Sequence, residues 1–185
     1  MSTTTAATTL TGTTWSIDPA HSHVEFAVRH MMITTVKGRF GIVRGTVRLD
    51  DPAHATSEAD IEIDADSIDT REAQRDAHLK SADFFDVEKF PKLTFKSTRV
   101  SDVKGDNFKL HGDLTIHGVT RPVTLDVTAE GRGKDPWGGE RAGFTARTQI
   151  KRSEYGLTWN QALETGGLLV GDEIKINLEV ELVKQ

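Results

Sequence analysis

Cysteine is absent from this chain of 185 residues. Its absence excludes disulfide bonds, thiolate metal sites and cysteine nucleophiles together. The sequence also lacks any run of roughly 18 consecutive apolar residues, so it contains no candidate for a membrane-spanning helix. The net charge is −5, and this acidic balance argues against nucleic acid as a partner. The remaining composition is typical of a single soluble domain whose core is large enough to enclose a cavity.

The N-terminal segment MSTTTAATTLTGTT has neither the basic start nor the apolar run of roughly 7 to 15 residues that a secretory signal needs. We therefore expect residues 1–13 to form a flexible Thr-rich tail and residues 14–185 to form one domain. Without a recognisable signal, the expected location is the cytoplasm.

Apolar and polar residues alternate along most of the chain from Trp15 onward, as in HVEFAVRH, NFKLHGDLTIHG and EIKINLEVEL. This period of two is typical of strands with one buried and one exposed face. The links between strands are short and rich in turn-forming residues, which favours antiparallel neighbours. About eight such strands predict an all-β fold, an extended antiparallel barrel that removes its own edges by closing. A barrel of eight strands has an interior that side chains fill or that holds one small ligand.

Two segments interrupt the alternation and predict one or two short helices. Residues 69–82 (DTREAQRDAHLKSA) contain good helix formers, with Asp69 or Thr70 as the expected N-cap. We interpret this helix as a cover over the barrel mouth, anchored by burial of the two phenylalanines that follow it, and a lid that gates ligand exchange is a subsidiary hypothesis. A second helix is expected around residues 160–165, capped by Asn160 and ended by Gly166 and Gly167.

The chain resembles the YceI-like family from about Trp15 to the C-terminus. The resemblance is carried, in the family's order, by WSIDPAHSHVEFAVRHMMITTVKGRFG, SIDTREAQRDAHLKSADFFDVEKFPKLTFKS, LTIHGVTRPVTLDV, DPWGGERAGFTA and YGLTWNQALETGGLLVGDEIKI. It implies a lipocalin-like barrel whose long apolar cavity binds polyisoprenoid chains or related amphiphiles such as fatty-acid amides, and it implies no known catalytic activity. Many members of the family carry a signal peptide and work in the periplasm, and this chain departs from that pattern.

The expected wall of the cavity follows from the alternation in this sequence. These side chains share the inward parity of their strands or lie at the predicted second helix, although each could also be an ordinary core residue. His30 shares the parity of the apolar face of its strand and could meet a ligand head group. The candidate ligand-binding residues are Val24, Phe26, Val28, His30, Phe40, Ile42, Ile61, Ile63, Leu93, Phe95, Leu114, Ile116, Leu125, Val127, Phe144, Ile150 and Trp159.

Three polar residues near the N-terminus suggest a different function. His21, His23 and Glu25 are spaced two apart and share the outer face of one strand, which is a chemically reasonable start for a metal site. A single strand rarely completes a coordination sphere, and the other histidines have no ligand-like spacing. We therefore expect no metal and no cofactor, and keep a metal-dependent enzyme built on these residues as the alternative. Another group, Arg75 with its neighbours Asp76 and His78, has no nucleophile in a motif beside it.

Together these observations predict a non-enzymatic protein that binds, stores or transports a polyisoprenoid, an isoprenoid quinone or a similar long-chain amphiphile. Each buried CH₂ group contributes about 0.8 kcal/mol, so a five-carbon isoprene unit contributes on the order of 3 kcal/mol before ordering costs. A chain of several units can bind without polar contacts. A homodimer is possible, and a stress-related interaction protein with a vestigial cavity is a third interpretation.

Overall fold

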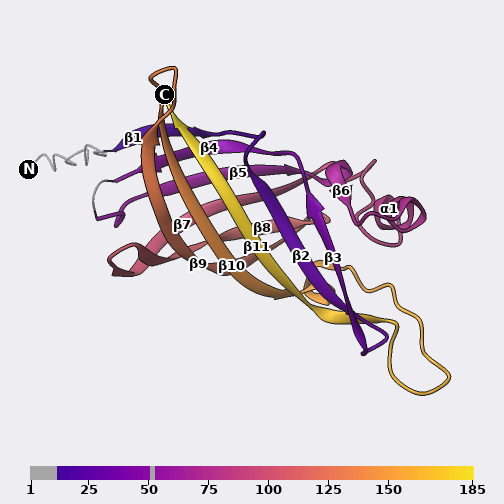
Figure 1. The fold of residues 1–185 in the computed structure, drawn as a ribbon. Coiled ribbons are helices and arrows are strands. Elements are labelled where there is room, and N and C mark those ends of the chain that lie inside the picture. Colours follow the sequence, from indigo (N-terminus) through magenta and orange to yellow (C-terminus); the bar gives the residue numbers. More distant parts are fainter. Residues whose placement is uncertain (1–11, 51–52) are drawn as a thin grey trace, which may run out of the picture.

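The computed structural model describes residues 12–50 and 53–185. Residues 1–11 of the predicted tail lie outside this range, and the first strand begins at Thr13. The strands of the described residues form one antiparallel sheet that curves into a barrel (Figure 1). They are β1 (Thr13–Ile17), β2 (His23–His30), β3 (Thr34–Phe40), β4 (Val43–Leu49), β5 (Glu58–Asp64), β6 (Ile68–Asp69), β7 (Lys92–Lys104), β8 (Asn107–Ile116), β9 (Val119–Lys134), β10 (Glu140–Lys151) and β11 (Val170–Lys184).

Eight strands close the barrel in the order β1-β4-β5-β7-β8-β9-β10-β11, and β1 then pairs with β11. Closure runs through the pairs Trp15–Lys184 and Ile17–Leu182. The earlier part of β11 pairs instead with β2, which pairs with β3, and β3 pairs with β6. The predicted all-β barrel of about eight antiparallel strands is confirmed, with β2, β3 and β6 extending its wall.

Strict alternation of burial explains why these segments are strands. On β8, Phe108, Leu110, Leu114 and Ile116 are all buried, whereas the residues between them are more exposed, apart from the buried Gly112. Each such side chain contributes roughly 1.5–3 kcal/mol when it leaves water. The apolar faces of all strands point into one interior, and this interior is the place where a ligand site can form.

Two glycines make room for phenylalanine rings inside the barrel. Gly38 on β3 lies opposite Phe26 on β2, and a Cβ atom at Gly38 would collide with the Phe26 ring. Gly112 on β8 likewise leaves space for the ring of Phe95 on β7, whose nearest atom would lie 2.5 Å from an added Cβ atom. Glycine lets an aromatic ring from the adjacent strand lie close over the backbone. These contacts shape the aromatic part of the interior.

The helix α1 spans Ala73–Lys80 and is shorter than predicted. Its N-cap is Glu72, whose carboxylate accepts from the backbone N–H of Gln74 at 3.2 Å. The predicted caps are wrong because Asp69 is paired in β6, and because Thr70 donates its own backbone N–H to Asp76 at 2.9 Å. Long-range pairing of β6 with β3 therefore decides where the helix begins.

The second predicted helix, around residues 160–165, is absent from the structure. This segment is a loop closed by an isolated bridge between Ala162 and Leu168. Asn160 does not cap a helix: its side chain donates to the carbonyl of Val170 at 2.7 Å and accepts from the N–H of the same residue at 3.0 Å. The only other helical turns of the described residues are the 3₁₀ turns η1 (Ala65–Ser67) and η2 (Arg152–Tyr155). Among the described helices, none has the length and apolarity to cross a membrane.

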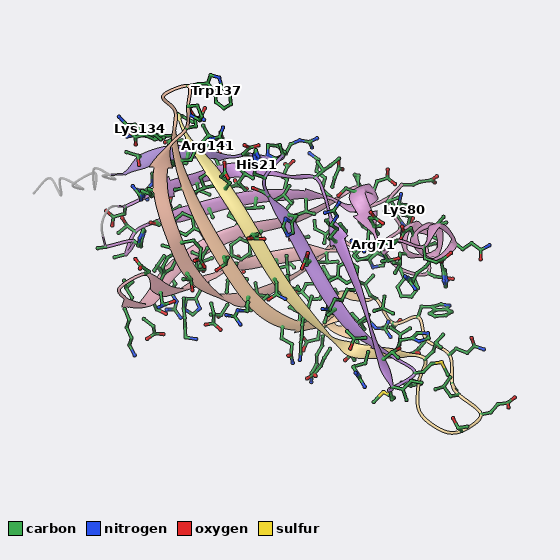
Figure 2. The ribbon with its side chains drawn as sticks, viewed as in Figure 1. His21, Arg71, Lys80, Lys134, Trp137 and Arg141 are labelled. Atoms are coloured by element: carbon green, nitrogen blue, oxygen red, sulfur yellow. The ribbon has the colours of Figure 1, made fainter. Side chains whose placement is uncertain are left out.

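The hairpin between β9 and β10 carries Trp137 at its tip, where the side chain is 87 % exposed. Asp135 holds this turn by accepting from the backbone N–H groups of Trp137 at 2.9 Å and Gly139 at 2.8 Å. Trp137 thus points into solvent, well away from α1 (Figure 2). It plays no part in the barrel interior.

Candidate ligand-binding cavity

An apolar cavity of about 140 Å³ lies inside the barrel and receives side chains from β2, β3, β5, β7, β8, β9, β10 and β11. Apart from Thr148 and Arg152, the residues that line it are aliphatic or aromatic. Val28, Ile150 and Ile176 point inward but are only partly buried, because they face this open space. Most residues predicted from alternation stand in the cavity wall. They are Val24, Phe26, Val28, Phe40, Ile61, Ile63, Leu93, Phe95, Leu114, Ile116, Leu125 and Ile150.

A second apolar cavity of about 70 Å³ lies further along the barrel interior. Val127 and Phe144, which we predicted for the main wall, line this second cavity instead. Ile61, Leu125 and Leu178 belong to both linings, so their side chains separate the two spaces. Movement of these three side chains would join the cavities into one elongated channel.

Three predicted residues lie outside both linings. Ile42 follows β3 in a tight connection and is 38 % exposed. His30 is the last residue of β2, and it does not line the cavity although its pairing partner Val170 does. Trp159 packs on the aromatic cover described below. These three residues thus do not line either cavity in this structure, and ligand contact by any of the candidates stays a prediction.

The alternation analysis did not select several wall residues. Those on β11 share the apolar face visible in EIKINLEVEL, so the same alternation could have found them. The others come from irregular segments or from the β9–β10 region, where periodicity is a weak guide. The additional wall residues are Leu79, Phe84, Phe85, Val123, Thr148, Arg152, Leu157, Val170, Ile174, Ile176 and Leu178.

An aromatic cover closes the cavity beside α1. Phe84 is 7 % exposed and lines the cavity, and its ring centroid lies 5.3 Å from that of Trp159. His78 on α1 meets the same tryptophan edge-on at 4.7 Å, and its Nε2 lies 2.8 Å from Asp83. Phe85 packs edge-on against Phe40 of β3 at 5.6 Å. The cover therefore contacts the cavity through Leu79 of α1 and through the two phenylalanines that follow the helix.

Arg152 is a buried cation in the wall of this apolar cavity. It is 6 % exposed and donates to the carbonyls of Gly171 at 2.8 Å, Leu157 at 2.7 Å, Trp159 at 2.9 Å and Val170 at 3.2 Å. Burial lowers the pKa of the guanidinium below its ordinary value, although arginine keeps its charge in proteins. Arg152 thus attaches the loop 156–169 to the start of β11.

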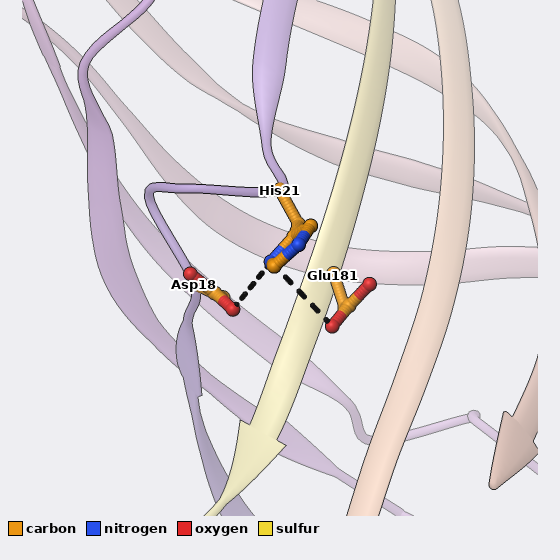
Figure 3. Close-up of side chains that lie close together, drawn as sticks. All are labelled: Asp18, His21 and Glu181. Atoms are coloured by element: carbon orange, nitrogen blue, oxygen red, sulfur yellow. Dashed lines mark hydrogen bonds and ion pairs between the residues drawn. The ribbon is translucent and has the colours of Figure 1, made fainter. Parts of the chain in front are cut away.

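The predicted metal residues do not come together. His21 lies with Asp18 and Glu181 on the outer surface, its Nδ1 2.8 Å and 4.0 Å from their carboxylate oxygens (Figure 3). His23 lies instead between Glu25 at 3.6 Å and Glu179 at 3.5 Å. In the part of the chain that the structure describes, Asp18, His21 and Glu181 are the one group with metal-like spacing.

A guanidinium already occupies the position of a cation in that group. Arg141 on β10 donates to Asp18 at 2.7 Å, to Glu181, and to Asp135 at 3.0 Å. These contacts join the chain before β2 to β10 and β11 and to the Trp137 hairpin. The group therefore acts as an ion-pair cluster on the barrel surface, and the structure gives no support to a metal-dependent enzyme at His21, His23 and Glu25.

This cluster makes stability depend on pH. Hydrogen bonds from His21 and Arg141 lower the pKa of Asp18 to about 2. A carboxyl group with a lowered pKa stabilises the fold above its unfolded pKa of 3.8, and this contribution disappears as pH falls towards 2. Asp18→Asn should therefore lower the free energy of unfolding by roughly 1 kcal/mol near pH 5 after allowance for solvent screening. Urea unfolding of the native protein and of Asp18→Asn between pH 2.5 and pH 7 measures this difference in free energy. A difference that stays constant as pH falls would contradict the role of the Asp18 carboxylate.

His21 responds in the opposite direction. Its hydrogen bond to Asp18 raises the pKa of the imidazole above the ordinary 6.5. The stabilisation from protonated His21 is complete below that value and is lost as pH rises through the raised pKa. The pair Asp18–His21 therefore contributes most between about pH 4 and pH 6.5.

A closed antiparallel barrel around an apolar cavity defines the structural class, and comparison with known proteins defines the family. The model of the YceI-like domain matches residues 15–182. The chain belongs to the YceI-like family. Protein YceI of Salmonella newport is 38 % identical over 165 residues, which cover 89 % of this chain and 83 % of that protein.

Solved structures share the same fold. BcnA of Burkholderia cenocepacia superposes with a TM-score of 0.78 at 26 % identity, covering 89 % of this chain and 98 % of that one. A polyisoprenoid-binding domain from Saccharophagus degradans superposes with a TM-score of 0.65 at 15 % identity, covering 92 % and 98 %. At 15 % identity, the similarity to the Saccharophagus degradans domain shows a shared fold and nothing more.

Proposed function

We propose that this protein is a non-enzymatic carrier or store for an isoprenoid lipid, held with its chain in the barrel interior. The observation that carries the proposal is the cavity inside the barrel, bounded by strands and by the aromatic cover and walled almost entirely by aliphatic and aromatic groups. The one hydroxyl in this lining, that of Thr148, donates to a backbone carbonyl, and the rest of the wall suits a chain of CH₂ and CH₃ groups. Membership of the YceI-like family and the shared fold of a polyisoprenoid-binding domain agree with this function.

The size of the cavity constrains how a chain enters. An apolar cavity of about 150 Å³ holds a group such as benzene. The main cavity, at about 140 Å³, therefore holds only a short part of a prenyl chain until other side chains move. Ile61, Leu125 and Leu178 separate it from the second cavity, and their displacement would extend the channel. Each further isoprene unit would then contribute on the order of 3 kcal/mol, less the cost of ordering it.

Organic extraction of the purified native protein, followed by mass spectrometry, tests the proposal. We expect an isoprenoid lipid to be recovered in roughly stoichiometric amount. An unrelated β-barrel protein of similar size, prepared from the same cells, is the control for carried-over membrane lipid. Recovery of no lipid, together with failure to bind an added farnesyl compound, would contradict the proposed function.

A further inference from the structure

The wall of the barrel opens along a seam between β9 and β10. Pairing between these strands runs from Glu140–Lys134 to Arg147–Asp126 and stops there, although β9 extends back to Val119 and β10 on to Lys151. Beyond that point β9 pairs only with β8, and β10 only with β11, among the described strands.

Proline marks the free edge of β9. Pro122 lies in the unpaired part of that strand, opposite Asp113 of β8. Proline has no backbone N–H to donate and is found in sheets at edges. Side chains bridge the seam instead: Thr148 donates to the carbonyl of Thr124 at 2.9 Å, and Arg121 donates to the carbonyl of Glu154 at 3.3 Å. Contacts of this kind part more easily than a continuous backbone ladder.

A polar groove of about 400 Å³ follows the seam on the outside of the barrel. Val123, Thr148 and Ile150 line both this groove and the apolar cavity within. These side chains therefore lie between a polar surface site and the interior that suits a prenyl chain. The charged residues of the groove are Lys151, Glu154 and Glu173.

Tyr155 lines the same groove and carries a polar atom without a partner. The residue is 1 % exposed, and its hydroxyl has no hydrogen bond within the structure. Burial raises the pKa of this phenol to about 12, so it stays a neutral donor at physiological pH. Buried polar groups almost always have a partner, and one without a partner calls for an explanation. Its neighbour Arg152 is bound to four carbonyls, which fixes the turn η2 and with it the position of the tyrosine.

We propose that the seam between β9 and β10 is the subsite for the lipid's head group, and that this head group presents an uncharged oxygen acceptor, such as a quinone carbonyl, to the Tyr155 hydroxyl. The chain passes between Val123 and Ile150 into the cavity. Glu154 and Glu173 balance Lys151 and the nearby Arg121, so the groove has no excess of positive charge to hold a diphosphate. The hydroxyl is almost inaccessible to water, and the head group therefore reaches it from within the parted seam. This inference rests on the proposed function.

Replacement of the hydroxyl alone tests the contact. Tyr155→Phe keeps the ring, and it should leave the melting temperature unchanged or higher because an unpaired buried hydroxyl is removed. The probes are a farnesyl chain that ends in a methyl ketone and the matching farnesyl hydrocarbon. We expect the variant to bind the ketone about tenfold more weakly and the hydrocarbon as well as the native protein does. Thr128→Val, which removes a hydroxyl from the paired part of β9, is the matched control and should change neither affinity.

A spectroscopic measurement reports the contact in the native protein. The chain contains a single tyrosine, so labelling with ¹³Cζ-tyrosine gives one signal. The ketone should shift this signal by forming a hydrogen bond to the phenol, and the hydrocarbon should leave it in place.

The outcomes separate the two proposals. Equal binding of both probes by the native protein and Tyr155→Phe, with an unmoved tyrosine signal, would overturn the seam subsite and leave the proposed function standing. Tighter binding of farnesyl diphosphate than of the ketone would overturn the assignment of an uncharged head group. Failure of the native protein to bind any of these farnesyl compounds would overturn the proposed function itself.

Discussion

Replacement of Arg152 by methionine should lower the free energy of unfolding by about 3–5 kcal/mol, because four carbonyls lose a charged donor and a buried acceptor left unsatisfied costs about 1–3 kcal/mol. Methionine fills much of the space but leaves the carbonyls of Leu157, Trp159, Val170 and Gly171 without their donor in a dry environment. The loop 156–169 would lose its attachment to β11, and the cavity would lose part of its wall. Urea unfolding followed by tryptophan fluorescence measures the change.

A matched control lies five residues earlier, on the strand that leads into η2. Arg147 on β10 is exposed, and Arg147→Met should change the free energy of unfolding by no more than about 0.5 kcal/mol. The loss of unfolding free energy in Arg152→Lys should lie between those of Arg147→Met and Arg152→Met. An ammonium group keeps the charge but cannot reach all the carbonyls that the planar guanidinium binds. A loss below about 1 kcal/mol for Arg152→Met would show that the carbonyls find other partners.

Val28→Trp should weaken binding of a farnesyl ligand by about 100-fold, a difference of about 2.7 kcal/mol. Val28 lies in the cavity wall between its aliphatic pairing partners Val36 and Ile174, and an indole placed there fills much of a space of about 140 Å³. Because the new ring occupies existing space, the cost of overpacking should stay within about 1–3 kcal/mol. Displacement of a fluorescent prenyl analogue measures the affinity, and circular dichroism checks the fold.

Glu25→Trp is the control for that substitution. It places the same indole on the same strand but on the outer face, where the Glu25 side chain is 57 % exposed. Its affinity for the ligand should match that of the native protein. If the folded Val28→Trp protein binds within threefold of the native protein, the ligand does not occupy the main cavity.

Much of the barrel could be predicted because each strand buries one face. In HVEFAVRH, the inward set Val24, Phe26 and Val28 follows from period two alone, and the structure places all three in the cavity wall. Alternation identifies the face, but it does not show where along the barrel the cavity ends. His30 at the end of β2 has the right parity and still does not line the cavity, although its partner Val170 does.

The errors arise where distant contacts override local preference. Asn160 is a good helix cap, yet its side chain binds the backbone of Val170, so the expected helix is a loop. Pro122 is the one residue in the sequence that indicates the seam between β9 and β10. The rest of the seam could not be predicted, because the point where pairing ends depends on how two strands diverge in space. No pattern within one strand could reveal the unpaired hydroxyl of Tyr155, which depends on burial by the whole fold.

The pairing of β1 with β11 has a consequence for biosynthesis. The first strand of the barrel finds its final partner only after the last strand has left the ribosome, since Trp15 pairs with Lys184. Until then, β1 has β4 on one side and an open edge on the other. Closure between such distant segments is slow and leaves strand edges exposed to other chains. Nascent molecules of this protein should therefore depend on chaperones more than a helical protein of equal length.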